Sequence, residues 1–126
     1  LCVHMILNLP WDDMVDVIEG AKFLSAFRID YVKLHSLYVV QGTSLGDMYA
    51  GGEIEICSLQ EYLERVATFL RYLHRETVVQ RLAAKGPRGK VLFCNWDMDY
   101  RQVVQAIEGY LESNDIYQGM DLEIIR

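Results

Sequence analysis

The chain has 126 residues, 52% of them hydrophobic, with 12 basic and 18 acidic side chains and a net charge of −6. This hydrophobic content excludes a disordered chain, and the length is enough for one domain with a buried core. The acidic balance argues against a general nucleic-acid surface, because phosphate contacts need clustered Lys and Arg. The longest apolar runs are only strand-sized, so we expect no membrane span.

The three cysteines, Cys2, Cys57 and Cys94, are odd in number and widely spaced. Disulfide frameworks and zinc sites both use tighter, paired spacing. We therefore expect reduced thiols, most of them in the core, in a cytoplasmic protein. The first residues, LCVHMILNLPW, lack the basic region and cleavage site of a signal peptide. A chain that opens on Leu and runs directly into a strand is expected to be a piece of a longer protein.

The first part of the chain predicts a strand, a helix and a second strand. The apolar run Val3–Leu7, ended by Pro10, is typical of a parallel strand buried on both faces. Apolar residues at three- and four-residue spacing predict a helix over Asp12–Phe27, with acidic residues in its first turn. Tyr31–Val40 is rich in Val, Leu and Tyr and predicts the second strand.

The second part begins with a long connection, Gln41–Cys57, which holds four glycines and an expected short helical turn. Ser58 and Glu61 have the spacing of a capping box and predict a helix that runs to about His74. The remaining predicted elements are a third strand, a loop, a short extended piece and a last helix, at Thr77–Leu82, Ala83–Lys90, Val91–Cys94 and Asp99–Ser113. Strands that alternate with crossover helices require parallel pairing, so the fold class is α/β.

Four segments carry a family resemblance: HMILNLP, YVKLHSLYVVQGT, SLQEYLERVATFL and RLAAKGPRG. Together they resemble the C-terminal part of a radical S-adenosylmethionine (SAM) protein. The resemblance is to an uncharacterised bacterial family related to the elongator-type radical SAM acetyltransferases, and it covers about residues 3 to 113. Such enzymes hold a 4Fe-4S cluster with a CxxxCxxC loop, and this chain has no such motif.

The resemblance implies that residues 1–82 form the C-terminal half of a partial (βα)6 TIM-like barrel. Residues 83–126 would be a C-terminal helical extension packed on the same domain. SAM and the 4Fe-4S cluster are then expected in the full-length parent, and no cofactor in this fragment, which should be inactive alone. Its partner would be the N-terminal half of the same protein. Because an opened barrel leaves unpaired strand edges, the isolated fragment is also expected to self-associate.

The resemblance also implies cofactor contacts on two strands. Val3–Leu9 corresponds to the fifth barrel strand, which flanks the adenine of SAM, and the strand from Tyr31 resembles the sixth. The implied cofactor-binding residues are Ile6, Asn8, His35 and Leu37. Two plainer interpretations stay open: Asn8 as the polar end of a buried strand, and His35 as a hydrogen-bonded structural histidine.

Basic side chains predict where a substrate of unknown identity binds. Lys33, His35 and Leu37 share one face of a regular strand, so Lys33 is expected to face the barrel interior. The segment Arg81–Lys90 holds four of the 12 basic residues and does not match a Walker A loop. The predicted substrate-binding residues are Lys33, Arg81, Lys85 and Arg88, and a solvated basic loop is the alternative.

Two patterns only superficially suggest a metal. Cys2 and His4 share a strand face but lack a third ligand nearby, so no metal site is expected. Asn95–Asp99 lacks the glycine and distal glutamate of a calcium loop, and Asp99 fits better as a helix N-cap.

No catalytic residue is assigned from the sequence. Besides a radical SAM fragment, a non-catalytic α/β module that binds a partner through its sheet edge stays open. A stand-alone acetyltransferase is weaker, because we find no acetyl-coenzyme A signature.

Overall fold

The computed structural model describes residues 2–86 and 90–122. Its helices and strands follow the order β1 Cys2–Ile6, α1 Met14–Ala26, β2 Tyr31–His35, β3 Val39–Val40, α2 Ser44–Ala50, α3 Leu59–Arg71, β4 Val78–Arg81, β5 Val91–Phe93, a 3-10 turn at Asn95–Asp97, and α4 Tyr100–Ser113. The predicted α/β class is confirmed. All three predicted long helices are present, and each begins one or two residues later than expected.

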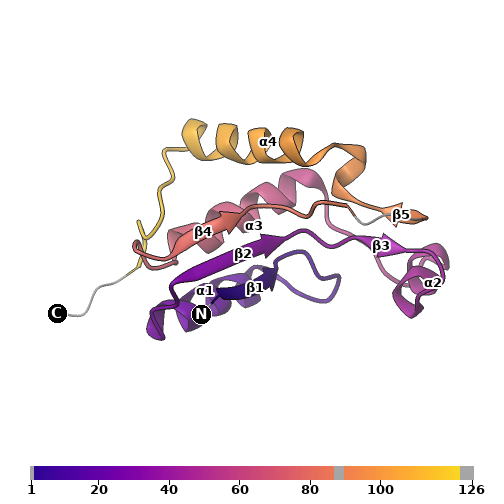
Figure 1. The fold of residues 1–126 in the computed structure, drawn as a ribbon, viewed down its shortest axis with the longest axis horizontal. Helices are drawn as coiled ribbons and strands as arrows, with labels where there is room; N and C mark the ends of the chain where they lie inside the picture. Colours follow the sequence, from indigo (N-terminus) through magenta and orange to yellow (C-terminus); the bar gives the residue numbers. More distant parts are fainter. Residues whose placement is uncertain (1, 87–89, 123–126) are drawn as a thin grey trace.

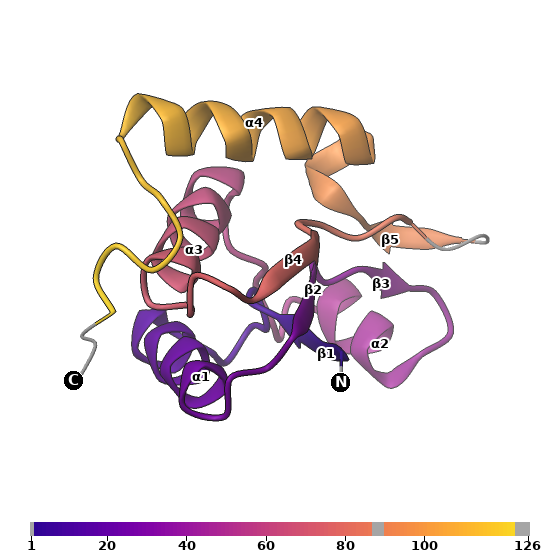
Figure 2. The same ribbon diagram turned by 60° about the vertical axis from the view of Figure 1, so that its left-hand side comes forward.

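The strands β1, β2 and β4 form a parallel sheet with β2 in the centre (Figure 1). Helices α1 and α3 pack side by side on one face of this sheet, and α4 lies against α3 (Figure 2). No helix of the described residues covers the opposite face. None of the described helices is long and apolar enough to cross a membrane.

The predicted strand Tyr31–Val40 is wrong in its second half. β2 ends at His35, and Val39 and Val40 instead pair antiparallel with β5. Directly after His35, the Ser36 hydroxyl bonds to Asn95 and the N–H of Leu37 donates to Asn8 Oδ1 at 2.7 Å, so neither residue continues the parallel ladder. Leu37 is buried and Tyr38 is exposed, so Leu37 does not share the strand face of His35.

The expectation that the first strand is buried on both faces is also wrong. In β1, Cys2, His4 and Ile6 are exposed, while Val3 and Met5 between them are half-buried and pack against the core. This alternation follows from the arrangement of the layers, since α1 and α3 cover only one face.

The helix starts are fixed by side-chain caps. Asp99 caps α4 as predicted, and it forms a capping box with Gln102. Asp13 forms another with Asp16 at the start of α1. Ser58 accepts from the N–H of Glu61 at 3.1 Å, but the Glu61 carboxylate turns to Arg65, 3.4 Å away. The expected capping box is therefore only half made.

The core lies between the sheet and α3. Nearly every position on the inward side of α3 is buried: Tyr62, Leu63, Val66, Phe69 and Leu70. The Tyr62 hydroxyl donates to the Leu82 carbonyl at 2.9 Å, and burial raises its pKa. All three cysteines are free, as expected, but Cys2 is exposed and the other two are half-buried, so the expected core position is wrong.

A buried polar cluster joins three segments where β2 ends. The Ser36 hydroxyl donates to Asn95 Oδ1 and accepts from the N–H of Ala84 at 2.9 Å, while Asn95 Nδ2 donates to the Ala84 carbonyl at 2.6 Å. Asn95, Trp96 and Asp97 all have left-handed backbone, with φ of 49°, 54° and 59°. This cluster attaches Ala84 and Asn95 to the end of β2.

Replacing Val66 by Asp should unfold the domain, whereas Gln60→Asp should leave it stable. Val66 is fully buried and Gln60 is exposed on the same helix. An unpaired carboxylate in the core costs about 3–5 kcal/mol, a large part of the stability of a small domain. Thermal melts followed by circular dichroism measure both variants, and equal melting temperatures would refute the assignment of the buried helix face.

Asn95→Gly should lower the free energy of unfolding by about 2–3 kcal/mol, because two buried hydrogen bonds are lost. Asn95→Ala should cost about 1 kcal/mol more, since alanine tolerates positive φ less well than glycine. Asp97→Gly is the matched control: it relaxes the same backbone at an exposed position and should not destabilise. Urea titrations that rank these variants differently would contradict the proposed role of the cluster.

Candidate functional site

The uncovered side of the parallel sheet carries four of the eight predicted site residues: Ile6, Lys33, His35 and Arg81. We call it the open face and define it by Cys2, His4 and Ile6 of β1, Tyr31, Lys33 and His35 of β2, and Val78, Gln80 and Arg81 of β4. The register places His4 beside Lys33 and Ile6 beside His35. A register shift after Val32 places Arg81 opposite Lys33. His35, Ile6 and Arg81 therefore lie where their strands end.

Two histidines meet on the open face. The rings of His4 and His35 stack with centroids 5.1 Å apart and planes inclined by 18°. His4 Nδ1 lies 3.0 Å from His35 Nε2, a hydrogen-bond distance. One of these nitrogens must donate and the other accept, so both rings cannot be fully protonated at once. The pair can therefore hold one shared positive charge.

Cationic side chains surround the histidine pair. The pKa of His35 is lowered by burial and, to a smaller extent, by the charges of His4, Arg81 and Lys33. The ion pairs among the described residues are Arg65 with Glu61 and Arg71 with Asp121. Within the described part of the chain, no carboxylate neutralises Lys33 or Arg81. The open face of this acidic protein thus carries two cations, Lys33 and Arg81, that influence His35 and have no carboxylate partner among the described residues.

The four predicted cofactor contacts separate into two groups. Ile6 is 38% exposed on the open face, and His35 is partly exposed beside it. Asn8 and Leu37 are buried and bonded to each other, so they hold the link between β2 and β3. The Asn8 Nδ2 atom has no hydrogen-bond partner among the described residues.

The predicted substrate-binding residues also lie in different places. Lys33 and Arg81 lie together on the open face. Lys85 instead places its Nζ over the Tyr100 ring at the start of α4, 5.4 Å from the ring centroid. Arg88 lies outside the described residues. The predicted cofactor and substrate roles of all these residues stay predictions.

Sequence reasoning missed His4 as a partner of His35. It considered His4 only beside Cys2, whose Sγ lies 3.7 Å from Gln80 Oε1. No group of three or more His, Cys, Asp or Glu side chains within the described ranges could hold a metal ion. The signal that could have found the pair is the parallel register, which places the two strands side by side.

A separate pocket of about 220 Å³ lies beyond the end of β1 and contains none of the predicted site residues. Its lining includes Leu9, Pro10, Cys57, Glu61 and Arg65. The guanidinium of Arg65 is already used, since it donates to the carbonyls of Leu7 at 2.8 Å and Asp12 at 3.1 Å. Burial raises the pKa of the Cys57 thiol to about 11, so it is a poor nucleophile at neutral pH.

Known proteins resemble this chain over most of its length. It is 29% identical to YtqA, an uncharacterised protein of Bacillus subtilis, and 32% identical to an uncharacterised protein of Methanocaldococcus jannaschii, in each case over 94% of this chain. The chain spans only 37% of the length of these relatives. Among solved structures, Elp3 of Methanocaldococcus infernus with residues 1–46 deleted matches with a TM-score of 0.73 at 17% identity. That match covers 93% of this chain and 28% of the Elp3 chain, and it shows a shared fold.

The family model described as the Radical_SAM C-terminal domain matches residues 29–113, more than half of the chain. This span includes β2, β4, α3 and α4, and therefore the buried polar cluster and the part of the open face that β2 and β4 form, but not β1. The resemblance stated from the sequence motifs is confirmed. The chain belongs to the Radical_SAM C-terminal domain family.

Proposed function

We propose that this chain is the C-terminal part of a radical SAM enzyme and that its open face is the inner wall of a partial (βα)6 barrel. The observation that carries the proposal is a parallel sheet that helices cover on one face only (Figure 1). The other face presents both cationic and apolar side chains. In barrels of parallel strands the reaction takes place at the carboxyl ends of the strands. His35, Lys33 and Arg81 lie at or near that end.

The proposed partner is the N-terminal half of the same protein, which would close the barrel over the open face. Residues 1–82 would supply the strands, and residues 83–126 the extension that braces them. The last described segment does not cover the open face, because Gly119 and Asp121 hydrogen-bond to the end of α3. The described part of this tail therefore leaves the open face accessible to the proposed partner.

The complete enzyme would hold SAM and the 4Fe-4S cluster. The described residues of this chain do not fit a cluster, since they include no suitable group of three metal ligands. We therefore place its ligands upstream and derive no chemical step from this chain, which we propose is inactive alone. Toward SAM, Ile6 offers apolar surface and His35 a ring nitrogen, while Asn8 and Leu37 would act by holding the adjoining link.

The alternative is a non-catalytic module that binds a partner through a sheet edge. It is supported by β1 and β4, each of which has one neighbour in the parallel sheet. Unpaired strand edges recruit other chains. A CxxxCxxC motif upstream in the same reading frame would favour the enzyme fragment, and a frame that ends without one would favour the module.

The isolated chain should self-associate through the open face. Ile6 and Val78 are 38% and 50% exposed there, and burying them against a second copy removes apolar surface from water. Ile6→Asp and Val78→Asp should weaken the association while leaving the melting temperature of the monomer nearly unchanged. Sedimentation at micromolar concentration measures the effect.

The matched controls are Val15→Asp and Phe23→Asp, which replace apolar residues that are 59% and 63% exposed on α1. Both lie on a helix that covers the other face of the sheet, so neither should change the association. A monomeric wild-type chain, or dissociation by the α1 variants alone, would contradict the proposal.

Anaerobic reconstitution with iron and sulfide should load no cluster on this chain, because cluster ligation needs about four ligands, usually cysteines. The complete parent, treated in the same way, should load one. Iron assay and the visible absorption spectrum report both results. A stoichiometric cluster on the isolated chain would place the ligands here and overturn the division between the two halves.

A further inference from the structure

We propose that the open face binds an anionic group of the substrate, a phosphate or a carboxylate, between Lys33, Arg81 and the His4–His35 pair. This inference rests on the proposed function only in taking the open face as the wall that meets the substrate. Nothing in the family match assigns a substrate class or a role to His4.

The argument begins with charge. The chain as a whole carries a net charge of −6, so a diffuse attraction for anions is not expected. Lys33 nevertheless lies between His4 and Arg81 in the sheet register. Neighbouring parallel strands are about 4.8 Å apart, so these three side chains project from adjacent positions. Neither cation has a carboxylate partner among the described residues, which leaves their charge available to a ligand.

The histidine pair adds a hydrogen-bond donor whose protonation changes when an anion binds. Without an anion, burial and, to a smaller extent, the neighbouring charges of His4, Arg81 and Lys33 lower the pKa of His35 and disfavour a proton on it. A bound anion offsets these charges and therefore raises the pKa of His35. His35 then gains a proton more readily, and the pair can form a charge-assisted hydrogen bond to the anion.

The residues that define the open face include no carboxylate that could compete with a bound anion. The further titratable side chains on this face are Cys2 of β1 and Tyr31 of β2. The pair and its two cations thus form a site that becomes more positive when an anion arrives.

The test follows the three histidines of the chain by proton NMR as the pH is varied. Titrations of the 126-residue chain with Val78→Ser, which weakens the proposed self-association without adding a charge to the open face, are compared in about 50 mM inorganic phosphate, about 50 mM acetate, and sodium chloride at matched ionic strength. Sedimentation at the NMR concentration checks that this chain is monomeric. His4→Gln and His35→Gln assign the signals. The pKa of the pair should rise by roughly half a unit or more in the anion that binds.

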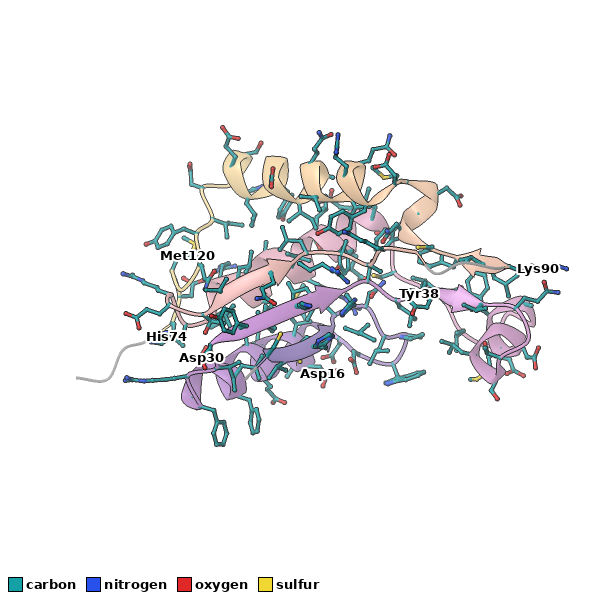
Figure 3. All side chains as sticks on the ribbon, in the orientation of Figure 1. Asp16, Asp30, Tyr38, His74, Lys90 and Met120 are labelled. Atoms are coloured by element: carbon teal, nitrogen blue, oxygen red, sulfur yellow. The ribbon has the colours of Figure 1, made fainter. Side chains whose placement is uncertain are left out.

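His74 is the internal control. It lies near Asp30, at the opposite end of the sheet from Tyr38 and Lys90 (Figure 3). Its Nδ1 accepts from the N–H of Glu76, so its surroundings are separate from the pair. A rise in phosphate alone identifies a phosphate site, and a rise in both anions identifies a site that also takes carboxylates. No rise, or an equal rise for His74, would overturn the proposal.

Variants identify the cations responsible. Lys33→Gln and Arg81→Gln should each remove at least half of the anion-dependent rise, while Lys22→Gln and Arg101→Gln, on the helices, should leave it intact. If all four variants reduced the anion-dependent rise in pKa equally, the rise would come from the overall charge of the protein and not from a site, which would overturn the proposal. The proposed function is tested by sedimentation and cluster loading, neither of which measures the pKa of the histidines, so the two proposals can fail independently.

Discussion

The hydroxyl of Ser36 holds together three segments that are far apart in the sequence. It donates to Asn95 and accepts from Ala84, and Asn95 in turn donates to the Ala84 carbonyl. All three residues are almost fully buried, so each of these polar groups depends on its partners. The cluster ends β2 at His35 and fixes the course of the chain after β4. The carboxyl edge of the open face is set by this arrangement.

The hydrophobic core of this chain forms without using the open face. α3 buries its apolar side against the sheet, α1 and α4, and this packing does not use the open face. Folding and the proposed assembly with the N-terminal half therefore use different surfaces. The apolar side chains left exposed on the sheet, Ile6, Tyr31 and Val78, are those that a closed barrel would cover.

The sequence alone predicts the elements that depend on residues close together in the chain. The apolar spacing of α1, α3 and α4 and the acidic cap at Asp99 depend on neighbouring residues, and these predictions are confirmed. The break after His35 could not be predicted, because Ser36 finds its partner at Asn95, 59 positions later. The His4–His35 pair was missed for a similar reason, since it exists only through strand register. Strand periodicity places Lys33 and His35 on one face, and the family resemblance indicates that this face meets the cofactor and substrate.

The central claim is that the open face is covered in the complete protein. Cys2 reports on it directly, because its thiol is exposed on the open face of this chain. The measurement is the rate of Cys2 alkylation, followed by mass spectrometry, in the isolated chain below micromolar concentration and in the complete parent. Cys94, half-buried by residues of this chain, serves as the reference. The account predicts that Cys2 reacts roughly tenfold or more slowly in the parent while Cys94 is unchanged. Equal rates for Cys2 in both proteins would contradict it.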